Sequence, residues 1–190
     1  MSKRKIRFDN VARSNARYRK IVDFRRIKTL VGLDISTQKT GVAIYSREVD
    51  AIVDAFAWFY GDLEEAEKFV RFFRDLEDLF SRVEYPVLVI SEALYLGRST
   101  VAFAKLNQLY GVLKLRAAMS NVTVIFEYPS KIRAQFGIKG NADKEEIITF
   151  VNSYLNMHLH FSNVKRYSDD DIADALMLVL FGRSLLLSVV

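Results

Sequence analysis

The chain has 190 residues, of which 51% are hydrophobic, and it contains no cysteine. This length suits one α/β domain with a short extension, and the apolar content is sufficient for a sizeable core. The lack of cysteine excludes disulfide bonds, thiolate metal sites and a cysteine nucleophile, and it fits a reducing compartment. We expect no signal peptide. The apolar stretch 173–190 is interrupted by Asp174 and Arg183, which predicts a buried helix and no membrane association.

Positive charge is concentrated in the first 28 residues. They contain eleven Lys or Arg against two Asp, a net charge of +9, whereas the whole chain has +5. A basic arm on a mildly acidic globule indicates a polyanionic partner or, alternatively, a solubilising tail. Phe8, Tyr18 and Phe24 are interleaved with the charges, so they either stack on bases or pack the arm against the domain or a partner subunit. We therefore assign residues 1–28 to a basic extension and residues 29–190 to a globular domain.

From Thr29 the hydrophobic pattern predicts a regular series of elements. They are strands at 29–35, 41–47 and 51–59, a helix at 62–81, a strand at 87–90, a helix at 100–118, a strand at 122–126, a loop at 129–141, a helix at 142–156 capped by Asn141, and a last helix from about residue 170. In the helix at 62–81 the predicted buried face consists of Leu63, Ala66, Phe69, Val70, Phe73, Leu76 and Phe80. Three antiparallel strands followed by alternating helices and strands describe the ribonuclease H-like fold, an α/β architecture with a mixed five-stranded sheet.

Four acidic residues occupy the ends of these elements. Asp34 lies near the end of the first strand, and Glu92 directly follows the apolar run 87–90. Asp171 and Asp174 share one face of the last helix, because residues three apart lie one turn apart. Acids in a first helical turn often only cap the helix, which explains Asp169 and Asp170 but not Asp174, whose neighbours are apolar. The sequence leaves open whether Asp170 or Asp171 belongs to the group.

Taken together, the acids indicate a metal site. Several carboxylates without nearby His or Cys match Mg²⁺ or Mn²⁺ rather than Zn²⁺. Two such ions would activate water and stabilise the leaving oxygen of a phosphodiester. The sequence therefore predicts metal-dependent phosphodiester chemistry.

Four motifs carry a family resemblance, in family order over about four-fifths of the chain. The segment GLDISTQKTG (32–41) resembles the first motif of RuvC-like resolvases in the ribonuclease H superfamily, and VLVISEALY (87–95) resembles their second acidic motif. GNADK (140–144) is similar to their basic motif, and DIADAL (171–176) to their closing motif. The resemblance implies a homodimeric, Mg²⁺-dependent endonuclease that cuts four-way DNA junctions by paired nicks. It also implies the cytoplasm of a bacterial or phage-infected cell, with an organelle as the alternative.

The resemblance also assigns roles to individual residues. Asp34, Glu92, Asp171 and Asp174 match the catalytic metal ligands, and Lys144 matches a catalytic lysine near the scissile phosphate. Tyr95 matches an aromatic wedge at the junction centre, although ordinary loop packing explains it equally well. The extension 1–28 has no counterpart in the compact bacterial enzymes, which indicates a phage or otherwise divergent member.

A basic surface is expected around the acids, because a nuclease must also hold phosphates. Its candidate DNA-binding residues are Tyr95, Arg98, Lys131, Arg133, Lys139 and Lys144, with Lys105 nearby. For Lys105 and Arg133 an ordinary solvated surface is an equal alternative. Lys144 begins a predicted helix, where a cation is electrostatically unfavourable, and this misfit favours a functional role.

Three other classes of function are compatible with parts of the pattern. A sugar-kinase or actin-like nucleotide-binding domain also has an Asp after its first strand, but it needs two such domains and this chain holds one. A non-catalytic nucleic-acid-binding module would normally have lost part of the acidic set. A related nuclease acting on flaps, replication forks or RNA–DNA hybrids remains open, and cleavage assays on matched substrates distinguish it.

Overall fold

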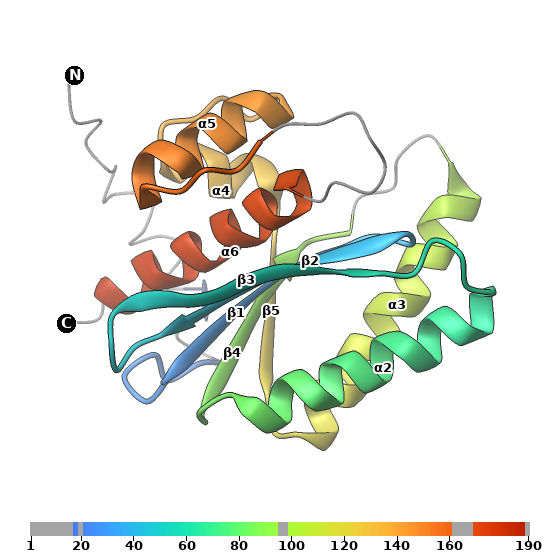
Figure 1. Ribbon diagram of the computed structural model, residues 1–190. Coiled ribbons are helices and arrows are strands. Elements are labelled where there is room, and N and C mark those ends of the chain that lie inside the picture. Colours follow the sequence, from blue (N-terminus) through green and yellow to red (C-terminus); the bar gives the residue numbers. More distant parts are fainter. Residues whose placement is uncertain (1–16, 19–20, 95–98, 161–168, 189–190) are drawn as a thin grey trace.

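The fold is built on a mixed five-stranded sheet with the strand order β3-β2-β1-β4-β5 (Figure 1). The computed structural model describes residues 17–18, 21–94, 99–160 and 169–188. The strands are β1 (Thr29–Ile35), β2 (Lys39–Ser46), β3 (Ala51–Phe59), β4 (Val87–Glu92) and β5 (Thr123–Glu127). The first three pair antiparallel, whereas β4 is parallel to β1, and β5 to β4. This arrangement confirms the predicted fold class.

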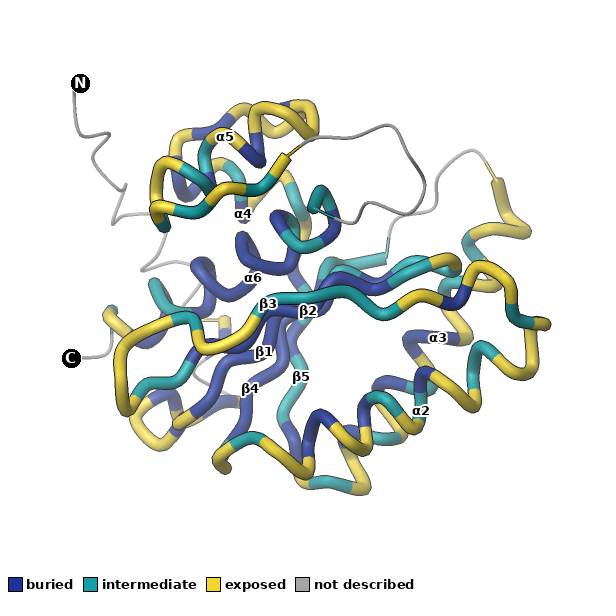
Figure 2. The backbone as a smooth tube through the Cα atoms, viewed as in Figure 1, coloured by how far each residue is buried: buried dark blue, intermediate teal, exposed yellow. Residues whose placement is uncertain are grey.

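Helices cover both faces of the sheet. On one face lie α2 (Glu65–Arg82) and α3 (Thr100–Met119), and on the other α4 (Pro129–Gln135), α5 (Lys144–Leu155) and α6 (Asp169–Leu187) (Figure 1). Each layer has its own hydrophobic cluster. The helix closest to the sheet, α6, is buried along most of its length (Figure 2). Within the described part of the chain, no helix is long and apolar enough to span a membrane.

The buried face of α2 differs from the predicted one. Leu76 and Phe80 are buried as expected, but Phe72 and Leu79 are buried too, and Val70 is 51% exposed. Phe72 is drawn inward by the aromatic side chains at the end of the sheet, since its ring makes edge-to-face contacts with Trp58 and Tyr60 at centroid distances of 6.2 Å. The helical period of this segment was predicted correctly. The apolar residues of α2 span a wider arc than the face that packs on the sheet, so the sequence did not define the orientation of the helix.

Two local predictions between β5 and α5 are wrong. The predicted loop contains the helix α4, which is too short for a helical period to be visible in the sequence, although Pro129 at its first turn is a favourable start. The helix α5 is capped by Asp143 rather than Asn141. The Asp143 side chain accepts a hydrogen bond from the Glu146 backbone, and the Glu146 side chain accepts one from the Asp143 backbone. This reciprocal pair satisfies two backbone donors, which a cap at Asn141 would not do.

The described part of the N-terminal extension packs into the α6 layer. Tyr18, Val22, Phe24 and Ile27 are all at most 5% exposed. The Arg47 guanidinium donates hydrogen bonds to the carbonyl oxygens of Phe24 (2.9 Å) and Ile27 (3.3 Å). Of the two roles considered for its aromatic residues, packing on the domain therefore holds for Tyr18 and Phe24. Phe8 lies outside the described residues.

Two glycines allow α6 to lie directly on the sheet. A Cβ atom at Gly32 of β1 would lie 2.2 Å from the Ala175 carbonyl oxygen, and one at Gly41 of β2 would lie 2.0 Å from the Asp171 carbonyl oxygen. Neither backbone oxygen can move away without shifting the helix. The approach of α6, and with it the position of its acidic first turns, therefore requires glycine at both sites.

We expect Gly32→Ala to lower the free energy of unfolding by about 1–3 kcal/mol or more, because the added methyl group overpacks a rigid contact. The matched control is Gly111→Ala in the exposed interior of α3, where a Cβ meets nothing within 4 Å. There alanine should stabilise by about 0.5–1 kcal/mol through helix propensity. Denaturant unfolding of both variants measures the difference. Equal changes in the free energy of unfolding would contradict the requirement for glycine where α6 contacts β1.

Candidate active site

Asp34 faces the α6 layer because side chains alternate along β1. Leu30 belongs to the hydrophobic cluster on the α6 side, whereas Val31 and Leu33 belong to the cluster on the α2 and α3 side. By this alternation Gly32 and Asp34 point toward α6. Asp34 is paired in register with Gly41, the residue on which the first turn of α6 rests. The strand therefore presents its one carboxylate to the acidic end of the helix.

Glu92 reaches the same edge of the sheet from β4. Since β1 and β4 are parallel, their carboxyl ends meet at one edge, where sites in α/β proteins commonly form. The hydroxyl of Ser91 donates to the Leu33 carbonyl oxygen at 2.8 Å, and the hydroxyl of Tyr110 donates to the Glu92 carbonyl oxygen at 2.8 Å. These hydrogen bonds fix the position of the backbone that carries the Glu92 side chain.

The first turns of α6 supply Asp170, Asp171 and Asp174. Lys39, at the start of β2, contacts both Asp170 (Nζ to Oδ1, 3.2 Å) and Asp171, and Lys144 contacts Asp170. Asp171 interacts electrostatically with Asp34, whereas Asp170 is held between the two lysines. This difference supports Asp171 over Asp170 as the member of the acidic group.

Burial and mutual repulsion raise the pKa values of these carboxyl groups. Burial, followed by the charges of Asp174, Glu92 and Asp171, raises the pKa of Asp34 well above its usual range. Burial and Asp174 raise the pKa of Glu92 to about 7, although Arg133 opposes the shift. The pKa of Asp174 rises to about 6, mainly through burial, against the charges of Arg133 and Lys144. The group thus holds more negative charge than its surroundings compensate.

Asp170 behaves in the opposite way. Burial alone would raise its pKa, but hydrogen bonds from Lys144 and Lys39 lower it to about 2. It therefore stays ionised and forms ion pairs. Lys39 was not predicted as a site residue, and the available signal was its place in the turn that follows the acidic strand. Its neighbour Gln38 is exposed.

The predicted basic residues occupy different environments. Arg133 of α4 lies 3.7 Å from Asp174 and donates to the carbonyl oxygens of Gly140 (3.2 Å) and Ala142 (3.1 Å), so it anchors the loop before α5. Lys131 pairs with Glu127, while Lys139 is exposed. Lys105 pairs with Glu65 at 2.8 Å, which fits the ordinary-surface alternative. Tyr95 and Arg98 lie outside the described residues.

Glu127 is a buried carboxylate at the same edge of the sheet, and sequence reasoning missed it. It ends β5 in register with Glu92, and it is 1% exposed. Its carboxylate accepts hydrogen bonds from the Tyr18 hydroxyl (2.9 Å) and the Tyr128 backbone amide (3.0 Å). The signal in the sequence was a Glu at the end of an apolar strand, the same pattern that identified Glu92.

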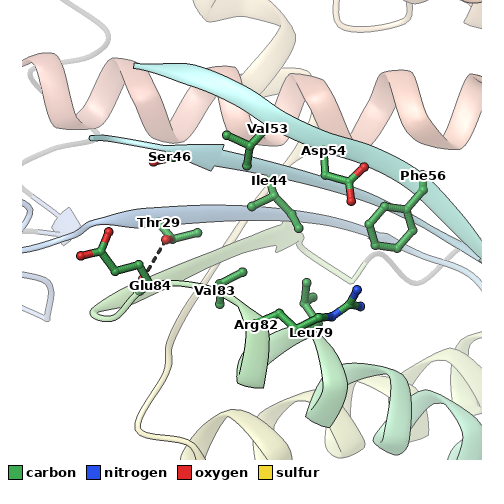
Figure 3. Close-up of a pocket in the computed structure, with 10 residues that line it drawn as sticks. All are labelled: Thr29, Ile44, Ser46, Val53, Asp54, Phe56, Leu79, Arg82, Val83 and Glu84. Carbon is green, nitrogen blue, oxygen red and sulfur yellow. Dashed lines mark hydrogen bonds between the residues drawn. The ribbon is translucent and has the colours of Figure 1, made fainter. Parts of the chain in front are cut away.

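A hollow of the described surface lies at the other end of the sheet. It is lined by residues of β1 to β3 and the end of α2, where the Thr29 hydroxyl donates to the Glu84 carbonyl oxygen at 2.7 Å (Figure 3). Thr29 begins the strand in which Asp34 is the penultimate residue. The hollow is therefore separate from the acidic group.

The chemistry of the acidic group fits a divalent cation. Its donors are carboxylate oxygens, the ligands that Mg²⁺ and similar hard ions take, and a bound cation would relieve the repulsion that raises their pKa values. Among the described side chains, no three acids already stand at the distances of a formed metal site. Instead Lys39, Lys144 and Arg133 contact the acids of α6.

Comparison with known proteins agrees with this fold. The architecture is that of a ribonuclease H-like domain: a RuvC structure from Thermus thermophilus superposes with a TM-score of 0.61 at 21% identity, covering 82% of this chain and 95% of that one. A second, described as T. thermophilus RuvC in complex with Holliday junction substrate, has a TM-score of 0.63 at 17% identity and covers 82% and 93%.

The sequence comparisons identify the family. The family model described as "Crossover junction endodeoxyribonuclease RuvC" matches residues 30–181. The RuvC protein of Chlamydia caviae is 30% identical over 159 residues, 80% of this chain and 89% of its own length. The chain therefore belongs to the RuvC family, whose members depend on divalent metal ions.

The raised pKa values predict how stability depends on pH. In the unfolded chain these carboxyl groups ionise near pH 4, whereas in the folded protein Asp174 and Glu92 hold their protons to about pH 6 and about pH 7. The folded state thus binds more protons in this window, so the free energy of unfolding falls as pH rises through it. We expect the metal-free melting temperature to decrease from pH 5 to pH 8.

Asp174→Asn provides the control for this prediction, since the neutral amide should flatten the pH dependence and raise the melting temperature at pH 8. A wild-type melting temperature that increases over the same range would contradict the electrostatic picture.

Proposed function

We propose that this protein is a divalent-metal-dependent endonuclease that resolves four-way DNA junctions by paired nicks. Family membership supports the reaction class, and the T. thermophilus relative described with a Holliday junction supports the substrate. The observation that carries the proposal is the electrostatic interaction among Asp34, Glu92 and Asp174, which come from three different elements. Such an accumulation of carboxylates is costly unless a cation joins it.

In this proposal Asp34, Glu92, Asp171 and Asp174 hold Mg²⁺, for which Mn²⁺ substitutes. When bound, such ions would supply an activated water molecule and would neutralise charge on the leaving 3′-oxygen. We propose that Lys144 contacts the scissile phosphate; its exposed side chain pairs with Asp170 at the start of α6, which supports this role. Arg133 holds Asp174 and the loop before α5 in position.

The DNA-binding surface is proposed to surround this edge of the sheet. Lys139 and Lys144 are exposed and suited to phosphate contacts. Lys131 is 53% exposed beside Glu127, and Tyr95 and Arg98 follow β4 in the chain. We further propose residues 29–190 as the nuclease domain and the basic extension 1–28 as an additional source of phosphate contacts, carried by the charges that precede Tyr18.

Substitution of the acids tests the proposed chemistry. Asp34→Asn, Glu92→Gln and Asp174→Asn should each lower the cleavage rate in Mg²⁺ by about 10³-fold, as the loss of a major electrostatic element does. Junction affinity should be kept or improved, because negative charge near the phosphates has been removed. Rates and affinities are measured on a four-way junction, a fork and an RNA–DNA hybrid of matched sequence.

The same assay separates the proposed function from its alternatives. Faster cleavage of the fork or hybrid would indicate a broader nuclease of the same superfamily. Binding without cleavage by the wild-type protein would indicate a non-catalytic module. Normal cleavage by Asp34→Asn would show that the acidic group is not the active site.

We also propose a homodimer, which places two active sites on opposed strands. The α3 helix exposes Val101 (65%), Leu115 (58%) and Met119 (62%), and their spacing puts all three on one stripe of the helix. A self-complementary apolar stripe is suited to a two-fold interface. We expect sedimentation to give a dimer at micromolar concentration and Leu115→Glu to shift it toward the 21.9 kDa monomer. A wild-type monomer both free and on junction DNA would refute the dimer.

A further inference from the structure

Tyr18 joins the N-terminal extension to the edge of the sheet that carries the acidic group. Its side chain is 3% exposed. Its hydroxyl donates a hydrogen bond to Glu127 Oε2 at 2.9 Å, with the Phe126 carbonyl oxygen 3.1 Å away. Its own carbonyl oxygen accepts from the backbone amides of Ile21 and Val22, both at 2.9 Å, which turns the chain into the core. The extension is therefore attached to the domain at this point.

The partner of Tyr18 is a buried carboxylate that needs hydrogen-bond donors. Glu127 is 1% exposed, and removing a carboxylate from water is costly unless placed donors replace the water. The Tyr128 backbone amide donates to Oε1 at 3.0 Å, and the Lys131 ammonium lies 3.3 Å from the same oxygen but is 53% exposed. Tyr18 thus adds a buried donor that comes from outside the β5 and α4 region.

Glu127 in turn determines the position of two elements of the active site. In the sheet it is the register partner of Glu92, and its carbonyl oxygen accepts from the Ala93 amide at 2.9 Å. Along the chain it is followed by α4, which begins at Pro129 and carries Arg133 to within 3.7 Å of Asp174. A displacement of Glu127 would therefore move both the end of β4 and the arginine that contacts α6.

We propose that Tyr18 is a positioning residue for the cleavage reaction, acting through Glu127 on Glu92 and Arg133. The inference rests on the proposed nuclease function. Tyr18 contacts none of the acids of the proposed metal site, so it supplies geometry and no chemistry. On this view the extension contributes to the site itself, in addition to any contact its charges make with DNA.

The competing explanation is that Tyr18 only anchors the extension. Both roles predict that Tyr18→Phe, which removes one hydroxyl group, lowers the melting temperature. Only the positioning role predicts a slower chemical step on bound DNA, because small misplacements of catalytic groups reduce rates without changing ground-state binding.

The test uses the full chain and single-turnover cleavage of a four-way junction at saturating enzyme in Mg²⁺, at a temperature below every melting midpoint. We expect Tyr18→Phe to reduce the rate by about 10- to 100-fold, on the scale of a small misplacement. The dissociation constant for junction, measured without divalent cation, should stay within about twofold of wild type, because the hydroxyl group contacts no DNA in this proposal.

Tyr45→Phe is the matched control. Tyr45 is 4% exposed and donates to the Asp50 carboxylate at 2.6 Å, but it pairs in register with Leu30, toward the opposite end of β1 from Asp34. This variant should lose stability in the same manner and keep its cleavage rate. Glu127→Leu provides a second variant, because it removes the acceptor of the Tyr18 hydroxyl group, whereas glutamine would keep an acceptor oxygen. In the Glu127→Leu background, Tyr18→Phe should therefore change the rate no further.

Different results would overturn the positioning role of Tyr18 and the proposed nuclease function. If wild type cleaves the junction and Tyr18→Phe cleaves it equally fast, the positioning role is overturned and the proposed function stands. Additive effects of Tyr18→Phe and Glu127→Leu would likewise overturn it. If the wild type cleaves no branched substrate, the proposed function is overturned together with this inference.

Discussion

The structure depends on the close approach of α6 to the centre of the sheet. Gly32 and Gly41 leave no side chain between the sheet and the carbonyl oxygens of Ala175 and Asp171, so the helix backbone lies directly on β1 and β2. This approach makes two acidic residues of α6, Asp171 and Asp174, neighbours of Asp34. Without it the same acids would be an ordinary charged helix end in solvent, with little influence on one another's pKa.

The resulting excess of negative charge is balanced only in part. Lys39 and Lys144 compensate Asp170, which lies beside the group and whose pKa is lowered. Asp34, Glu92 and Asp174 retain raised pKa values, although Arg133 opposes the shifts of the latter two. The repulsion among these carboxylates lowers the free energy of unfolding, and a divalent cation bound there would raise it again. Such local destabilisation is typical of functional sites.

The sequence predicted most of the fold and the acids because both follow short-range rules. Strand alternation and the apolar run 87–90 located β1 and β4, and carboxylates at their ends then fell at one edge of a parallel pair. Contacts between distant segments could not be predicted in this way. The orientation of α2 depends on the contacts of Phe72 with Trp58 and Tyr60. Lys39 forms its ion pair with Asp171 because α6 packs beside β2. The hydrogen bond between Glu127 and Tyr18 could not be predicted either, because the two residues lie 109 positions apart in the chain.

The N-terminal extension shows why charge alone is an incomplete guide to such a segment. Its composition indicates a polyanion-binding arm, yet Tyr18, Val22, Phe24 and Ile27 are buried in the same cluster as α6. The two properties are compatible because they belong to different parts of the segment. The apolar residues that pack lie between Tyr18 and Ile27, and the basic residues of the first half come before Tyr18. Because Tyr18 donates a hydrogen bond to the register partner of Glu92, the extension is attached next to the strand end that carries Glu92. An extension attached at this point can therefore affect both DNA binding and the geometry of the site.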